Sequence, residues 1–189
     1  TVEGPREILI NSLQHDAGVV GRIRAAKALA KEGSPKAVDA LAQALKTERF
    51  WGVRLEIAQL LGKNGTPAAR IALLACINDD HPKARAPIVD ALGQLPSHPD
   101  LIAALTRIAK EGDRSIQVEG SAIRALGRLR APGVIDLALQ VAERPSWGAL
   151  LACRALTAIS LTRDPAGLPH LLEWTKGDKN ERARCTAAA

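Results

Sequence analysis

A regular recurrence of proline divides this chain into segments of almost constant length. Along its 189 residues the spacing between these prolines is 32, 32, 33 and 33, at Pro35, Pro67, Pro99, Pro132 and Pro165. Four of the five follow Ser, Thr, His or Asp, and proline suits the first position of a helix because its missing N–H would have no partner there. A period of this length is typical of helical repeats that each pack only on their neighbours.

A second pattern falls between the prolines and predicts a second helix in each repeat. Similar ten-residue segments begin at Gly21, Val53, Ala84, Val118 and Leu151, and a sixth begins at Ala183. Positions 1, 5, 8 and 9 of these segments are almost always apolar, as expected for one buried helix face. Position 10 is glycine at Gly62, Gly93 and Gly127, which predicts that the helix ends there. The helices that follow the prolines are named A helices, and those in the ten-residue segments B helices.

The composition agrees with a fold built from helices alone. The chain holds 34 Ala and 25 Leu but only four aromatic residues, so the strong helix formers are abundant and the residues that favour strands are scarce. We therefore expect an all-α fold, an α-α superhelix of about five and a half helical hairpins, forming a single domain over residues 1–189. We expect the sequence to be a fragment, in which residues 5–14 are the last helix of a preceding repeat and residues 179–189 a truncated final helix.

Polar residues of the B helices fall on one narrow stripe, at positions 4, 7 and 11. The stripe is rich in basic residues in a chain of net charge +6: Arg24, Lys27, Lys31, Lys63, Arg124, Arg128 and Arg154. Two interpretations stay open. The stripe is either a solvated face with a cationic bias or a docking surface for an acidic partner, and we expect it to line the concave side of the superhelix.

Position 2 of most B segments is arginine, and an acidic residue stands six residues before each such arginine. The pairs are Asp16 with Arg22, Glu48 with Arg54, Asp79 with Arg85, and Asp178 with Arg184. An arginine in the first turn of a helix opposes the helix dipole, so a nearby acid is favourable. We interpret these pairs as structural ties between the A–B loop and the B helix. The fourth repeat breaks the rule, because Glu119 takes the arginine position behind Asp113.

These features resemble the HEAT repeat over the whole chain. The segment Val53-Arg54-x-x-Ile57-x-x-Leu60-Leu61-Gly62, preceded by an acid and repeated at a spacing of about 32 residues, is similar to the motif of that family. The acid–arginine pairs resemble its Asp–Arg ladder.

Three segments resemble, more narrowly, the C-terminal helical domain of zinc aminopeptidases related to alanyl aminopeptidase and leukotriene hydrolase. They are Phe50-Trp51-Gly52-Val53-Arg54, Arg144-Pro145-Ser146-Trp147, and Asp164-Pro165-x-x-Leu168-Pro169-x-Leu171-Leu172-Glu173-Trp174-Thr175. The resemblance implies a non-catalytic domain that packs on the catalytic domain of a parent metallopeptidase, a hydrolase, and restricts access to it.

No catalytic residue or metal ligand of that family is present in this chain. A zinc peptidase needs His-Glu-x-x-His, and the four histidines, His15, His81, His98 and His170, never stand four residues apart. The chain also has no methionine, so it lacks the exopeptidase motif Gly-x-Met-Glu-Asn. We therefore expect no enzyme activity and no cofactor in this chain, with zinc confined to the catalytic domain of the suspected parent.

Other functions stay open beside the aminopeptidase interpretation. One is a free-standing HEAT-repeat scaffold for protein–protein interaction, and another is a basic helical-repeat protein that binds DNA, like the alkylpurine DNA glycosylases. Repeat-bearing phycobilin lyases are a further alternative. The expected partner is thus the parent catalytic domain or another protein with an acidic surface, with nucleic acid as the less favoured choice.

The cysteines, tryptophans and apolar runs add expectations about location and packing. Cys76, Cys153 and Cys185 are widely spaced and odd in number, which favours a reducing, cytoplasmic location. The longest apolar run, residues 71–77, is far shorter than a membrane span, so we expect no membrane partner. The three tryptophans, at positions 51, 147 and 174, are expected to anchor one repeat to the next.

Overall fold

The computed structural model of the chain describes residues 4–189, and every regular element in this range is helical. It divides into two compact units, here named unit 1 (Thr1–Leu95) and unit 2 (Pro96–Ala189), and each is described by itself. The sequence predicted a single domain. The division falls in the loop after the third B helix, beside Pro96, where the backbone cannot continue a helix.

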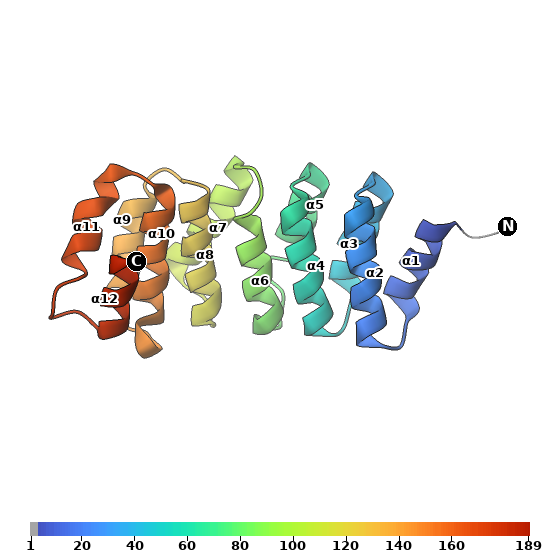
Figure 1. The fold of residues 1–189 in the computed structure, drawn as a ribbon, viewed down its shortest axis with the longest axis horizontal. Helices are drawn as coiled ribbons and strands as arrows, with labels where there is room; N and C mark the ends of the chain where they lie inside the picture. The colour runs from blue at the N-terminus through green and yellow to red at the C-terminus, as the bar shows by residue number, and fades with distance from the viewer. Residues whose placement is uncertain (1–3) are drawn as a thin grey trace. The chain divides into compact units, whose positions relative to one another are not determined.

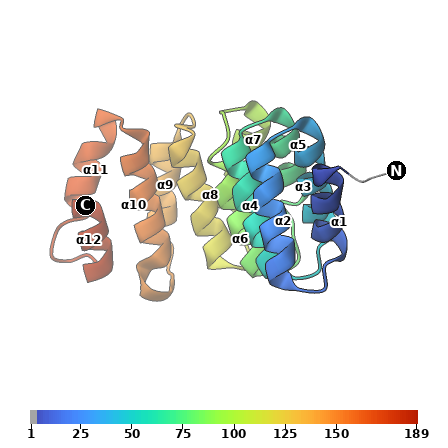
Figure 2. The same cartoon turned by 45° about the vertical axis from the view of Figure 1, so that its right-hand side comes forward.

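Unit 1 holds three helical hairpins. Its helices are α1 (Pro5–His15), α2 (Val19–Glu32), α3 (Pro35–Thr47), α4 (Trp51–Asn64), α5 (Pro67–Ala75) and α6 (Pro82–Leu92). The B helices α2, α4 and α6 stand side by side in one row, with α3 and α5 in a second row behind them (Figures 1 and 2).

Unit 2 holds the other three hairpins, with two short 3₁₀ turns beside its last helices. Its elements are α7 (Pro99–Glu111), α8 (Ile116–Arg128), α9 (Val134–Ala142), η1 (Trp147–Ala149), α10 (Leu150–Thr162), η2 (Pro165–Gly167), α11 (Leu168–Glu173) and α12 (Glu181–Ala188). The B helices α8, α10 and α12 pack in sequence, and α9 covers α10 from the A side. Each unit is therefore a stack of hairpins, and the predicted all-α solenoid fold is confirmed.

Helix α1 takes a different place from the one expected for residues 5–14. It packs against α2, with which it forms a hairpin, and also touches α3. The A helix α3 makes the same two kinds of contact, with α4 and with α5. Residues 5–15 are thus the A helix of the first hairpin and not the last helix of a preceding repeat. Pro5, at the first position of α1, stands 30 residues before Pro35 and extends the proline series to this helix.

Three of the five prolines that define the repeat are the first residues of helices, Pro35 of α3, Pro67 of α5 and Pro99 of α7. Pro165 begins the 3₁₀ turn η2, and Pro132 lies in the turn before α9, so the prediction of a helix start is wrong at Pro132. The hydroxyls of Ser34 and Thr66 each accept a hydrogen bond at 3.2 Å, from the N–H groups of Ala37 and Ala69. These caps satisfy amide groups that have no carbonyl partner in the first turn of a helix. The sequence period therefore reflects the repeated need to begin a new A helix.

The glycines at position 10 of the B segments pack helices closely and do not all end them. Gly62 lies inside α4, which ends at the left-handed Gly65 (φ +73°), and Gly127 lies inside α8. A Cβ atom on Gly62 would lie 3.0 Å from the carbonyl oxygen of Ala91 on α6. On Gly127 it would lie only 2.4 Å from the carbonyl oxygen of Ala158 on α10. Only Gly93 directly follows a helix, α6, as predicted.

Candidate functional site

The basic stripe of unit 1 lies on the exposed faces of α2 and α4. Arg24, Lys27, Lys31 and Lys63 are all exposed to solvent. One of them has an acidic neighbour on the next helix, because the ammonium of Lys27 lies 3.4 Å from Glu56, whose side chain is 29% exposed. Gln59, at position 7 of the B segment in α4, is exposed on the same stripe. The stripe of unit 1 is thus a real cationic surface with one acid in it.

The stripe of unit 2 is more closely packed. Arg128 is exposed, whereas Arg124 and Arg154 are half-buried. A Cβ atom on Gly120 of α8 would come within 2.8 Å of Cγ of Arg154, so the glycine leaves room for the arginine stem to lie across α8. That the two stripes line a concave surface stays a prediction.

Along the A–B loops of unit 1, arginines and acids form a ladder that joins one hairpin to the next. Arg22 of the first hairpin donates from Nε to Glu48 of the second at 2.8 Å. Arg54 of the second lies 3.1 Å from Asp79 of the third. Both arginine side chains are 15% exposed and their acids 8% and 5%. Burial at this level reduces solvent screening, so these pairs differ from ordinary surface ion pairs.

Contacts inside one hairpin use the backbone instead of the carboxylate. Arg22 donates to the carbonyl oxygen of Asp16 at 2.8 Å, and Arg85 donates to that of Asp79 at 2.7 Å. The carboxylates of Asp16 and Asp79 each accept the N–H group two residues ahead, at 2.7 and 2.9 Å. Each acid therefore shapes its own loop, and its spacing of six residues from the arginine brings the backbone carbonyl into reach.

The other predicted pairs are arranged differently. Glu48 accepts from the N–H group of Phe50 at 2.8 Å and pairs with Arg22, while Arg54 turns to Asp79 and Asp80. On α12, Nε of Arg184 is buried and has no hydrogen-bond partner among residues 4–189.

In unit 2 one rung of the ladder has its charges exchanged. Glu119 stands on α8 where the other repeats have arginine, and it is only 7% exposed. Arg144, which lies 25 residues later in the next A–B loop, donates to Glu119 at 2.5 Å. The same guanidinium also donates to the carbonyl oxygens of Ala109 and Lys110 at 2.9 and 3.1 Å. The apparent exception in the sequence is therefore a rung with acid and base in opposite places.

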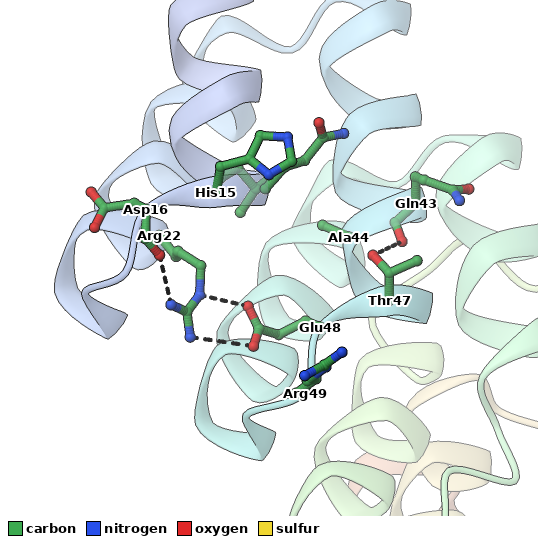
Figure 3. Close-up of a pocket in the computed structure, with 10 residues that line it drawn as sticks. His15, Asp16, Arg22, Gln43, Ala44, Thr47, Glu48 and Arg49 are labelled. Carbon is green, nitrogen blue, oxygen red and sulfur yellow. Dashed lines mark hydrogen bonds and ion pairs between the residues drawn. The ribbon is translucent and has the colours of Figure 1, made fainter.

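A pocket of about 560 Å³ lies beside the first rung in unit 1 (Figure 3). The Arg22–Glu48 pair forms one side of it, and the C-terminal turns of α1 and α3 contribute His15, Gln43 and Thr47. The hydroxyl of Thr47 donates to the carbonyl oxygen of Gln43 at 3.1 Å. Because both carboxylates of the pocket, on Asp16 and Glu48, already accept loop N–H groups, the pocket is first of all part of the ladder.

The three tryptophans differ: Trp51 contacts the next hairpin as expected, Trp174 is buried beside a lysine of its own hairpin, and Trp147 is exposed. Trp174 is 8% exposed and lies under the ammonium of Lys179, 4.6 Å from the ring centre. Trp51 stacks on His81 with ring centres 5.8 Å apart and an interplanar angle of 8°. Trp147 is 86% exposed, so the expectation that it anchors neighbouring repeats is wrong. Nothing in the sequence pattern distinguishes it from the other two.

The cysteines are free thiols in three different environments. Cys153 is buried, Cys185 is exposed, and Cys76 is intermediate. Burial raises the pKa of the Cys76 thiol, with a further upward contribution from Asp79 and opposing ones from Lys46 and Arg54. A thiol with a raised pKa is a poor nucleophile at neutral pH, so Cys76 has the character of a packing residue.

Within residues 4–189, no group of three or more His, Cys, Asp or Glu side chains is placed to hold a metal ion. Among the described helices, none has the length and apolar character needed to cross a bilayer.

Comparison with known proteins identifies the repeat. The model of HEAT repeats matches residues 6–93, 50–116 and 72–156 in three overlapping stretches. No curated protein matches the chain in sequence. Among solved structures, the phycocyanin lyase complex of CpcE and CpcF from Nostoc sp. PCC7120 aligns with 98% of this chain and 76% of its own, with 23% identity and a TM-score of 0.69. Human deoxyhypusine hydroxylase, solved in complex with glycerol, aligns with 97% of this chain and 82% of its own, with 16% identity and a TM-score of 0.56.

At these identities the two structures share the fold alone with this chain. Neither they nor the family model is a zinc aminopeptidase, so the narrower resemblance finds no support among them. The HEAT model, in contrast, spans most of the residues and coincides with the hairpins and the arginine ladder described above. The chain therefore belongs to the family of HEAT-repeat proteins.

Proposed function

We propose that this chain is a non-catalytic scaffold that binds a protein segment of acidic character along its B helices. The observation that carries the proposal is the cationic stripe on α2 and α4, where Arg24, Lys27, Lys31 and Lys63 are exposed on one face of unit 1. Among the residues that the structure describes, Glu56 offsets part of this charge by direct contact with Lys27. Such a surface attracts an acidic partner and speeds its association.

The chemistry of the described residues supports binding in preference to catalysis. The acids of the A–B loops are engaged by loop N–H groups and by arginines, as Glu48 is by Phe50 and Arg22. Carboxylates held in this way are poorly placed to move protons for a substrate. The phycocyanin lyase structure is that of an enzyme, but it is also a complex of two proteins, and this supports protein binding by a chain of the same fold.

The narrower reading, a helical domain of a zinc aminopeptidase, rests on the three sequence segments around Trp51, Trp147 and Trp174 alone. A His-Glu-x-x-His string encoded upstream of Thr1 would favour it.

DNA binding rests on the cations of the stripe, which carries no aromatic side chain for base stacking. The three free cysteines support a reducing, cytoplasmic location.

The test compares charge reversal on the two helix rows of unit 1. The variant Lys31→Glu with Lys63→Glu changes the B row, and the matched control, Lys36→Glu with Lys46→Glu, changes two exposed lysines of α3. Binding of labelled polyglutamate and of a DNA duplex is measured by fluorescence anisotropy at several salt concentrations. We expect the B-row variant to bind polyglutamate about tenfold more weakly than the wild type, and the control to stay within about twofold.

Two results would contradict the proposal. If the wild-type chain does not bind polyglutamate, or if the control loses as much affinity as the B-row variant, the stripe is only a solvated face. Tighter and more salt-dependent binding of the duplex, lost in the B-row variant, would favour nucleic acid as the partner.

A further inference from the structure

The indole of Trp147 is the most exposed large apolar side chain in residues 4–189, at 86%. It lies in η1, at the beginning of α10 in unit 2. Leaving so much apolar surface in water is unfavourable, and a single tryptophan of this kind is the residue type most enriched at the energetic centres of protein interfaces.

Hydrogen bonds of Arg144 and Ser146 tie the loop before Trp147 to neighbouring elements. Arg144 is fixed by Glu119 and two carbonyl oxygens, and the hydroxyl of Ser146 accepts the N–H group of Leu151 at 3.0 Å. The two residues after the tryptophan, Gly148 and Ala149, are both left-handed, with φ of +57° and +53°. For Ala149 this conformation is unfavourable because of its Cβ atom, so the surrounding contacts must enforce it.

This loop differs from the first four A–B loops in a way that explains the exposure. In the loops at Asp16, Glu48, Asp79 and Asp113, an acid accepts the N–H group two residues ahead. In the fifth repeat Ser146 takes the place of the acid, and it caps a residue five positions ahead instead. The indole is thereby presented on a preformed loop, which lowers the entropy lost when a partner covers it.

The charges next to the indole indicate the chemistry of that partner. The guanidinium of Arg182 lies beside the loop that carries the indole. Its Nη1 atom would be 3.3 Å from a Cβ atom placed on Gly148. Arg182 is exposed, and no carboxylate pairs with it within the described part of the chain. The nearby acid Glu143 is paired with Lys179 at 3.8 Å. One turn along α10 from η1 lies Arg154, which belongs to the basic stripe of unit 2.

From this juxtaposition we propose that Trp147 and Arg182 form an anchor point of unit 2 for an acidic protein segment that carries an apolar residue. The apolar side chain of the segment covers the indole, a neighbouring carboxylate pairs with Arg182, and further acids follow the stripe along α10 and α8. This inference rests on the proposed function and names the feature of the partner that the stripe alone leaves open.

The test uses the full chain and two labelled peptides of Glu and Asp, one with a central Leu-Phe pair and one with Ser-Ser at the same place. Binding is measured by anisotropy for the wild type, Trp147→Ala and Arg182→Glu. The matched controls are Leu172→Ala and Arg107→Glu, which change an exposed leucine of α11 and an exposed arginine of α7. Circular dichroism checks that every variant keeps its helices.

We expect Trp147→Ala to bind the Leu-Phe peptide about tenfold more weakly and the Ser-Ser peptide as the wild type does. Arg182→Glu should weaken both peptides, and the controls should weaken neither. The indole emission should shift to the blue with the Leu-Phe peptide alone, and the shift should vanish in Trp147→Ala.

If the wild type binds both peptides and Trp147→Ala leaves both affinities unchanged, the anchor is wrong while the proposed function stands. If the wild type binds neither peptide, the proposed function fails and this inference fails with it.

Discussion

Glu119 and Arg144 form a half-buried ion pair in which the acid and the base occupy each other's usual places. In unit 1 the arginine lies on the B helix and the acid in the next loop, as in Arg22–Glu48, whereas here the acid lies on α8 and the arginine in the loop. The rung tolerates this exchange because both arrangements join the first turn of a B helix to the A–B loop of the next hairpin. In each case the link is one guanidinium and one carboxylate.

The first prediction concerns this pair. Glu119→Gln should lower the free energy of unfolding by about 2–3 kcal/mol, because it leaves the half-buried guanidinium of Arg144 without its carboxylate. The control Glu143→Gln removes an acid that is 69% exposed and lies 3.8 Å from Lys179. It should lower the free energy of unfolding by less than about 0.5 kcal/mol. Urea denaturation followed by circular dichroism measures both, and equal losses would show that the exchanged rung adds nothing to stability.

The second prediction concerns Arg22, which joins two hairpins through Glu48 and its own loop through the carbonyl oxygen of Asp16. Arg22→Lys should destabilise the chain by about 1–2 kcal/mol, because an ammonium cannot reproduce the fork of donors that spans both acceptors. The control Arg24→Lys alters an exposed residue of the same helix and should have almost no effect. If thermal unfolding shows the two variants to be alike, the ladder does not link the repeats energetically.

The third prediction separates two glycines that the sequence treats alike. Gly127→Ala should cost at least about 2 kcal/mol, because its Cβ atom would lie 2.4 Å from a carbonyl oxygen and the backbones of α8 and α10 would have to separate. Gly62→Ala, with a nearest approach of 3.0 Å, should cost less. The melting temperatures of the two variants test the order, and the reverse order would contradict the packing of these helices.

The fourth prediction concerns the reactivity of the cysteines. Iodoacetamide at neutral pH should modify Cys185 first and Cys76 slowly, because burial holds the pKa of the Cys76 thiol above its ordinary value of 9.0. The folded chain then keeps this proton more tightly than the unfolded chain does. The contribution of Cys76 to stability is therefore present below that ordinary pKa and is lost as the pH rises above it. Mass spectrometry of the alkylated peptides over a pH series gives the rates, and equal rates for the two thiols would refute this assignment.

Several features of the fold could be predicted from the sequence because they depend on neighbours in the chain. Pro35 and Pro67 begin helices in the structure as the sequence indicates, since a proline after a capping hydroxyl satisfies a purely local requirement. The burial of Val53, Ile57 and Leu61 on one face of α4 follows from helical periodicity in the same way.

The partners of the ladder could not be predicted, because each arginine has more than one acid at a plausible distance. Arg22 stands six residues after Asp16 and 26 residues before Glu48, and the sequence favours the nearer acid. The structure gives Arg22 the backbone carbonyl of Asp16 and the carboxylate of Glu48, because the carboxylate of Asp16 is turned to the loop N–H group of Gly18.

The sequence by itself determined the helical repeat, since the repeat follows from periodicity along single helices, and it predicts the cationic stripe on the same ground. Only the tertiary structure decided that Gly127 packs two backbones together, that Glu119 is neutralised by Arg144, and that Trp147 stays in solvent. These three outcomes depend on which atoms of the next hairpin lie opposite each residue. Packing between repeats sets that arrangement, and it leaves no periodic pattern in the sequence.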